Sequence, residues 1–108
     1  MTLKDFINQL HTVVDKSILF KDDLSSCQVT DVIVKDRYVI LKLHNNKSKY
    51  FQVNTLVRKL LTLDEDKDMF IAYTYTCYAI RSLTIRRDVV IIHSNIIANK
   101  YIIADYGC

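Results

Sequence analysis

The sequence predicts an α+β domain, with a mainly antiparallel sheet of about six or seven strands. An apolar pattern of helical period opens the chain, and a second, shorter helical pattern lies near its middle. The remaining segments alternate in the manner of strands. The chain has 108 residues, 50% of them hydrophobic and 25% charged, which is the size and balance of a single domain over residues 1–108.

An amphipathic helix is predicted over residues 3 to about 15, because large apolar side chains recur there at i, i+3 and i+4 spacing. This stripe consists of Leu3, Phe6, Ile7, Leu10, Val13 and Val14. Thr2 and Asp5 have the spacing of a capping box, in which each side chain accepts a hydrogen bond from the other residue's backbone N–H. The start of this helix is therefore well specified.

Three antiparallel strands in a meander are expected next. Residues 27–36 and 38–44 alternate and are rich in Val and Ile, with a turn at Asp36 and Arg37 between them. Residues 49–53 continue the pattern after an Asn-rich turn, since asparagine tolerates positive φ. The polar residues 21–26 are expected to bridge the first helix to these strands.

A short second helix is predicted over residues 55–63, with Asn54 as its N-cap. Leu56, Val57, Leu60 and Leu61 fall on one face of this helix. Residues 64–68 then form a loop that is expected to be solvated, because most of its side chains are acidic.

The rest of the chain is dominated by Ile, Val, Tyr and Thr, so about three or four further strands are expected there. Breaks are predicted at residues 87–88, 94–95 and 99–100. No internal repeat is recognisable, and the strands lie too close in sequence for parallel crossovers. The sheet should therefore carry the first helix on one face.

The composition bounds the location and the origin of the protein. No apolar run approaches the roughly 18 residues of a membrane span, and the first residues lack a secretory signal, so a cytoplasmic protein is expected. Cys27, Cys77 and Cys108 are odd in number and widely spaced, which favours reduced thiols. Residues with A/T-rich codons outnumber those with G/C-rich codons, a bias frequent in viral and phage reading frames.

Motifs for catalysis and for metal or cofactor binding are not recognisable in the sequence. His11, His44 and His93 lack metal-ligand spacing to a cysteine or carboxylate, and the acidic segments lack the pattern of a calcium loop. With one glycine in the chain there is no glycine-rich phosphate-binding loop. We therefore expect a protein that is not an enzyme and needs no metal or cofactor.

Two groups of residues are candidates for binding a partner protein. Tyr73 and Tyr75 project together from one predicted strand, and tyrosine provides contact area at low entropic cost. Arg86 and Arg87 lie at a predicted turn, where their planar guanidinium groups could hold an acidic partner. The alternatives are aromatic residues simply favoured in strands and a solvated turn.

A nucleic-acid interface is the alternative functional site. Residues 35–59 are strongly basic and contain aromatic residues, as single-stranded nucleic acid requires for phosphate contact and base stacking. The candidate residues are Lys42, Lys47, Lys49, Tyr50, Arg58 and Lys59. Against this site, the strand period puts Lys42 and Arg37 on opposite faces, and a net charge of +3 is mild for a nucleic-acid-binding protein.

The favoured hypothesis is a small non-enzymatic interaction protein of viral or phage origin. It would bind and block a host protein, such as a defence or nucleic-acid-processing factor, in the cytoplasm of the host cell. The alternative is a single-stranded nucleic-acid-binding protein. Free sheet edges and an aliphatic C-terminal segment also predict a two-fold homodimer.

Overall fold

The structure is a computed structural model and describes residues 1–16, 19–22, 27–44, 50–72 and 76–94. These ranges contain two helices and six strands. In chain order they are α1 (Leu3–Gln9), β1 (Leu19–Asp22), β2 (Gln28–Val34), β3 (Tyr38–His44), α2 (Val53–Leu60), β4 (Asp68–Ala72), β5 (Cys77–Ile85) and β6 (Val89–Ser94). The predicted α+β class is confirmed.

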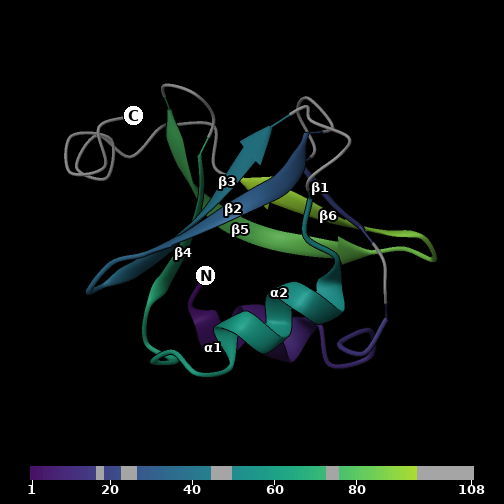
Figure 1. The fold of residues 1–108 in the computed structure, drawn as a ribbon, viewed down its shortest axis with the longest axis horizontal. Coiled ribbons are helices and arrows are strands. Elements are labelled where there is room, and N and C mark those ends of the chain that lie inside the picture. Colours follow the sequence, from purple (N-terminus) through teal and green to yellow (C-terminus); the bar gives the residue numbers. More distant parts are fainter. Residues whose placement is uncertain (17–18, 23–26, 45–49, 73–75, 95–108) are drawn as a thin grey trace.

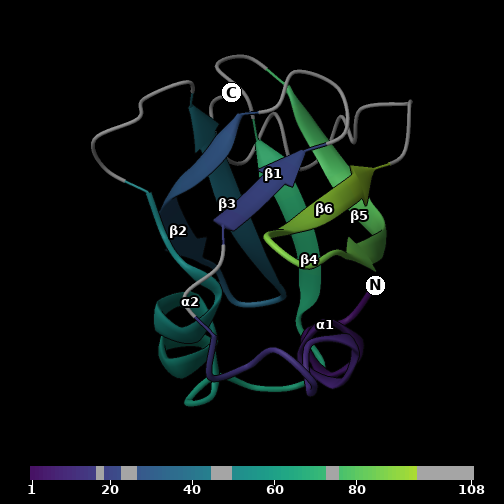
Figure 2. The same ribbon diagram turned by 90° about the vertical axis from the view of Figure 1, so that its right-hand side faces the viewer.

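The strands form one six-stranded sheet in the order β1-β6-β5-β4-β3-β2 (Figure 1). Three of its pairs, β2–β3, β4–β5 and β5–β6, are antiparallel, and β3–β4 and β1–β6 are parallel. The sheet curves until its edge strands β1 and β2 lie near each other, so it is nearly closed. Both helices lie together at one end of this sheet (Figure 2).

The first helix begins as predicted and ends early. The Thr2 hydroxyl accepts from Asp5 N at 3.2 Å and the Asp5 carboxylate accepts from Thr2 N at 3.5 Å, which confirms the capping box. The helix ends at Gln9, not near residue 15, and i→i−3 bonds such as Val13 N to Leu10 O (2.9 Å) carry the chain onward. The β-branched run after His11 has low helix propensity, which accounts for this end.

The predicted meander is correct for two of its three strands. Residues 38–44 form β3 as predicted, and β2 lies within residues 27–36. The third strand, over residues 49–53, is wrong, because Val53 belongs to the apolar stripe of α2 and starts that helix. The N-cap of α2 is accordingly Gln52 and not Asn54. β1 was not predicted, and it includes Lys21 and Asp22, which were expected to belong to a polar bridge.

Parallel pairing in the sheet also differs from the prediction. The chain between β3 and β4 includes α2, which makes room for a crossover, and β4 therefore lies parallel to β3. β1 lies parallel to β6, although the two strands come from opposite ends of the described chain. Each parallel pair joins the first half of the chain to the second.

The fold consists of two similar units, each a helix, one strand and a hairpin of two strands, although the sequence predicts no repeat. The first unit contains α1 to β3 and the second contains α2 to β6. Both hairpins carry a bulge at the corresponding place, between Val29 and Asp31 in β2 and between Ile80 and Ser82 in β5. The two units are therefore related by an approximate two-fold rotation.

Hydrogen bonds between the units follow the same symmetry. Phe51 N, just before α2, donates to Val29 O at 2.7 Å, and Met1 N, just before α1, donates to Ile80 O at 3.2 Å. Each helix also forms a hydrogen bond with the loop before the other unit's first strand. Lys4 N donates to Glu65 O at 3.1 Å, and Asn54 N donates to Lys16 O at 3.2 Å. Each unit therefore holds the helix of the other.

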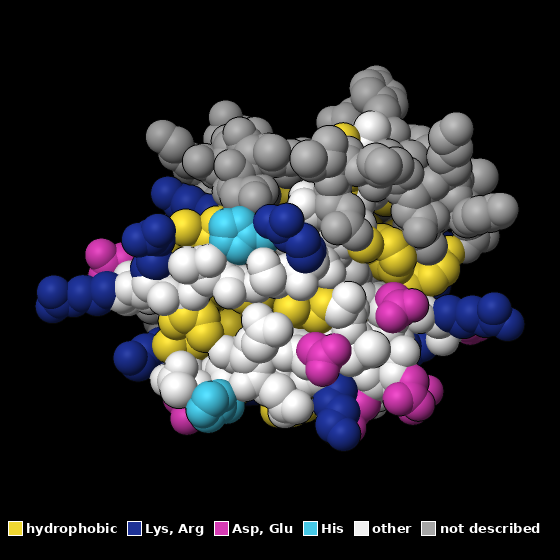
Figure 3. All heavy atoms as spheres, turned by 180° about the vertical axis from the view of Figure 1, so that it is seen from behind, with side chains coloured by type: hydrophobic (Ala, Val, Ile, Leu, Met, Phe, Trp, Pro, Cys, Tyr) yellow, Lys and Arg dark blue, Asp and Glu magenta, His cyan; other side chains and the backbone are white. Residues whose placement is uncertain are grey.

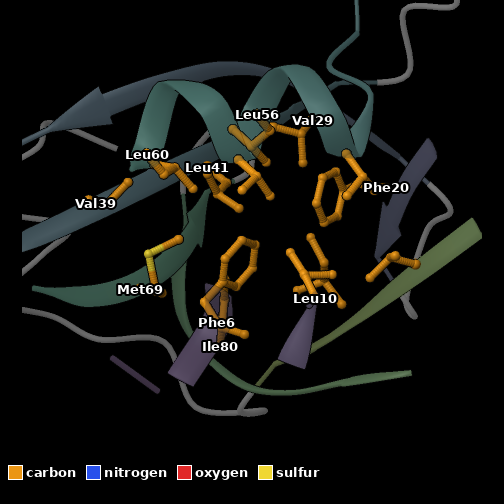
Figure 4. Close-up of a cluster of buried hydrophobic side chains, with 14 of the residues drawn as sticks. Phe6, Leu10, Phe20, Val29, Val39, Leu41, Leu56, Leu60, Met69 and Ile80 are labelled. Carbon is orange, nitrogen blue, oxygen red and sulfur yellow. The ribbon is translucent and has the colours of Figure 1, made fainter. Parts of the chain in front are cut away.

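The main core fills the space between the concave side of the sheet and the two helices (Figure 4). Phe6 of α1 and Phe20 of β1 stack there, with ring centroids 5.9 Å apart. Other fully buried members are Leu3, Leu10, Leu41, Leu56, Leu60, Met69, Ile71, Ile80 and Ile92. The first predicted helix therefore packs against the sheet as expected, and α2 shares that position.

A second buried cluster lies on the opposite face of the central strands. It contains Ile40, Phe70, Ala72 and Cys77. Because Val39 and Leu41 point into the main core, β3 is apolar on both faces, as is usual for strands in parallel pairs. Among the described residues, no helix is long and apolar enough to cross a membrane.

Candidate functional site

The two hairpin turns lie at opposite ends of the long axis of the molecule (Figure 1), whose Cα extents are 35 × 28 × 22 Å. The turns correspond to each other in the two units. Lys35 N donates to Tyr38 O in the β2–β3 turn, and Arg86 N donates to Val89 O in the β5–β6 turn, both at 2.9 Å. The same backbone geometry therefore presents different side chains at the two ends.

The β5–β6 turn, residues 85–89, is the arginine end. It contains both arginines singled out in the sequence, Arg86 and Arg87, and both are exposed. Ile85, which is 37% exposed, precedes them, and Asp88 supplies an acidic side chain. The predicted turn is thus confirmed, and it places an aliphatic side chain beside two guanidinium groups.

The β2–β3 turn and the loop that packs beside it, residues 34–38 and 64–68, form the acidic end. Asp68 N donates to Arg37 O at 3.0 Å, which joins the loop to the turn. Lys67 Nζ donates to Lys35 O at 2.6 Å and to Asp36 O at 2.8 Å. The ammonium group of Lys67 is therefore held against backbone carbonyls of the turn.

The acidic end contains two hollows. One of about 430 Å³ is lined by Val34, Lys35, Asp36, Arg37 and Tyr38. The other, of about 330 Å³, is lined by Asp36, Arg37, Asp64, Asp66, Lys67 and Asp68. Val34 is 45% exposed and provides an apolar wall for the first hollow.

The two ends differ in charge. At the acidic end, the carboxylates of Asp36, Asp64, Glu65, Asp66 and Asp68 outnumber the cations of Lys35, Arg37 and Lys67. At the arginine end, Arg86 and Arg87 outnumber Asp88. Lys and Arg side chains project at both ends in Figure 3, while Asp and Glu are more numerous on the side of the β2–β3 turn. The approximate symmetry of the backbone is therefore not followed by the surface charge.

The tyrosine candidates for partner binding, Tyr73 and Tyr75, lie outside the described residues. Tyr78 is half-buried in β5, where it is paired with Ile71 of β4 and packs against the main core. The structure therefore places Arg86 and Arg87 and leaves the proposed role of the two tyrosines as a prediction.

The basic candidates for nucleic-acid binding fall into separate places. Lys42 lies on the outer face of β3 with Asp31 of β2 as its cross-strand neighbour, near the end of β3 that is remote from α2 (Figure 1). Tyr50, Arg58 and Lys59 are exposed just before and on α2. Lys47 and Lys49 lie outside the described residues.

One cation and one aromatic ring of this segment are in contact. Lys59 Nζ lies 5.5 Å from the centroid of the Phe51 ring, within the range of a cation–π interaction. Phe51 is half-buried and packs against the main core, while Tyr50, beside it in the chain, is 38% exposed. The structure thus brings Lys59 against Phe51, next to Tyr50, whereas Lys42 lies on the outer face of β3.

Histidine and cysteine side chains in the described ranges have local surroundings. His11 Nδ1 lies 2.9 Å from Asn8 O, and His93 Nε2 lies 2.6 Å from Thr84 Oγ1. Cys27 is half-buried and Cys77 is buried. Within these ranges, no three His, Cys, Asp or Glu side chains lie close enough together to hold a metal ion.

The sequence analysis missed the hollows, because the acidic loop was interpreted only as solvated charge. The position of that loop depends on the parallel β3–β4 pair, which brings Asp68 beside the β2–β3 turn. The available signal in the sequence was the difference in charge between the two hairpin turns, which read Lys-Asp-Arg and Arg-Arg-Asp. Comparison of the chain with protein-family models, with curated protein sequences and with solved structures gave no match.

Proposed function

We propose that this chain is a non-enzymatic interaction protein that binds a host protein through its arginine end and blocks it. The observation that carries this proposal is the exposed group of Ile85, Arg86 and Arg87 on a hydrogen-bonded turn at one extremity of the molecule. Arginine is enriched in protein interfaces, because its flat, weakly hydrated guanidinium group pairs with carboxylates and stacks on aromatic rings.

The hairpin supports this role by limiting the entropic cost of binding. β5 and β6 pair from the turn down to Ile80 and Ser94, so the turn extends from a regular part of the sheet. Side chains held on such an element lose less conformational freedom on binding than side chains of a loose loop. Tyr73 and Tyr75, which precede β5, remain part of the proposed partner surface. The viral or phage origin, the blocking action and the host cytoplasm as the location are parts of the same proposal.

The approximate symmetry of the molecule provides a matched control for the experiment. The variant with Arg86→Ala and Arg87→Ala removes the guanidinium groups of the arginine end, and the variant with Lys35→Ala and Arg37→Ala removes two cations from the corresponding turn. Tagged proteins would be expressed in the native host, and the captured protein would be quantified by mass spectrometry. A third variant, Tyr73→Ala with Tyr75→Ala, tests the tyrosines.

We expect the arginine-end variant to retain less than a tenth of the captured partner, and the control variant to retain most of it. All variants should have the circular dichroism spectrum of the wild type, because the substituted arginine and lysine side chains are exposed. Equal capture by the arginine-end variant and by the control would contradict the proposal.

Single-stranded nucleic-acid binding is the second candidate function, and the contact of Lys59 with Phe51 favours it. Tyr50 is exposed next to Phe51 in the chain, and Arg58 is exposed next to Lys59 in the last turn of α2. This function predicts binding of a labelled oligonucleotide, measured by fluorescence anisotropy, that weakens steeply as salt increases. Anisotropy that stays at the value of the free oligonucleotide, even at low salt, would rule this candidate out.

Self-association as a two-fold homodimer also stays a proposal. The nearly closed sheet reduces one argument for it, because the edge strands β1 and β2 lie near each other and are less available to a second copy. A surface other than a sheet edge has to be considered.

A further inference from the structure

The two ends of the molecule differ in their surfaces. The arginine end projects along the long axis and carries the exposed Ile85 at its base (Figure 1). The acidic end has two hollows, one of which includes the apolar side chain of Val34. A projecting turn on one copy therefore has a receiving surface on the opposite end of another copy.

The two ends are also complementary in charge. The smaller hollow is lined by four acidic residues, Asp36, Asp64, Asp66 and Asp68, and by two basic residues, Arg37 and Lys67. Lys67 donates to two carbonyl groups of the turn, and with Arg37 it offsets only two of the four acidic side chains. Two guanidinium groups on an adjacent copy would supply the missing positive charge, and bidentate pairing with carboxylates is the preferred geometry of arginine.

A contact between an acidic loop and a hairpin turn already exists within the molecule. At the acidic end, an acidic loop of the second unit packs beside the basic hairpin turn of the first unit. At the arginine end, the corresponding loop of the first unit contains Asp15 and Lys16, which together carry no net charge. Among the described residues, the segment before β1 therefore supplies no excess of acidic side chains comparable to that of residues 64–68.

We propose that the arginine end of one copy docks on the acidic end of a second copy, so that the chain associates head to tail. This inference rests on the arginine end being a binding surface, as in the proposed function. Because the two contacting surfaces are different and lie at opposite ends of the long axis, the interface is heterologous and does not close with two copies. Association continues to open chains or larger rings.

The contact is dominated by exposed charges, so it is weak and sensitive to salt. In sedimentation-velocity experiments at low ionic strength, the weight-average mass of the wild type increases with protein concentration. In about 0.5 M salt, where the Debye length falls below the size of a side chain, the mass returns to that of the monomer.

Two charge-reversal variants separate the two surfaces. Arg86→Glu with Arg87→Glu removes the positive surface and leaves the acidic end intact. Asp64→Lys with Asp66→Lys removes the negative surface and leaves the arginine end intact. All four residues are exposed, and unchanged circular dichroism spectra and melting temperatures would confirm that both variants are folded.

Each variant alone is expected to be monomeric at low ionic strength, at concentrations where the wild type associates. An equimolar mixture is expected to associate again, because the intact acidic end of the first variant binds the intact arginine end of the second, and the two reversed surfaces are also opposite in charge. A wild type that stays monomeric, a variant that still associates alone, or a mixture that stays monomeric would each overturn the proposal.

These outcomes can be distinguished from failure of the proposed function. A wild-type protein that is monomeric but loses its captured host protein when Arg86 and Arg87 are replaced supports the host-binding role and overturns only head-to-tail association. A protein that associates head to tail, but captures the same host protein with or without these arginines, supports the association and contradicts the host-binding role.

Discussion

Replacing Phe20 by alanine is the most direct test of the arrangement of the core, because β1 was not predicted from the sequence. Phe20 is completely buried and its ring stacks on that of Phe6 at a centroid distance of 5.9 Å and an interplanar angle of 18°. Truncation of a fully buried phenylalanine costs about 3–5 kcal/mol, from lost transfer free energy and the remaining cavity. The ring pair accounts for roughly 0.5–1.5 kcal/mol of additional coupling.

The free energy of unfolding would be measured by urea denaturation followed by circular dichroism. Since small domains are stable by only about 5–15 kcal/mol, Phe20→Ala should shift the unfolding midpoint strongly or leave the protein partly unfolded. Phe20→Leu retains more of the core volume and serves as the folded reference. In a double-mutant cycle, Phe6→Leu and Phe20→Leu should be less destabilising together than the sum of the single effects.

The refuting result is specific. A Phe20→Ala protein destabilised by less than about 1 kcal/mol would behave like a variant at an exposed position. β1 would then not pair with β6 over the core, and the position of the first unit's strand in the sheet would be wrong. Met69, which occupies the corresponding place in β4 and is completely buried, provides the matched comparison, since Met69→Ala should cost about 2–5 kcal/mol.

Further predictions concern the helix caps and a buried hydroxyl, and all are measured as changes in the free energy of unfolding. Thr2→Ala removes the capping box of α1 and should destabilise the protein by about 1 kcal/mol, whereas an effect near zero would mean that the cap is not formed. Gln52, the N-cap of α2, makes no side-chain capping bond, and the first turn of α2 has no acidic residue. Gln52→Asp should therefore stabilise the protein by about 0.5–1 kcal/mol. A loss of stability would contradict this assignment of the helix start. Ser94 Oγ is buried and has no hydrogen-bond partner within the described part of the chain, so Ser94→Ala should raise stability by up to about 1 kcal/mol. A clear destabilisation would show that the hydroxyl has a partner.

Elements that depend on local pattern were predictable from the sequence. The alternation of Val39, Leu41 and Leu43 identifies β3 with its observed bounds, and the Thr2–Asp5 spacing identifies the start of α1. The turn at Arg86 and Arg87 follows from the break between two aliphatic runs. In each of these cases, the residues that decide the structure are neighbours in the chain.

Elements that depend on distant residues were not predictable. β1 has four residues, of which Lys21 and Asp22 are polar, and it becomes a strand because β6 pairs with it. Corresponding positions of the two units hold different amino acids, since Phe20 corresponds to Met69 and Tyr38 to Val89. No repeat can therefore be recognised in the sequence. The acidic end of the candidate site has the same origin, because its loop reaches the β2–β3 turn only through the parallel pair.

The hydrogen bonds between the two units affect how the chain folds. The segment around Met1 and Thr2 is bonded to Ile80 and Asp68, and Phe51 is bonded to Val29, so neither half has its own complete set of partners. These contacts join residues far apart in sequence, which slows folding and makes the last steps cooperative. Two fragments made by cutting the chain between His44 and Tyr50 should each be largely unstructured and should recover the native circular dichroism spectrum only when they are mixed.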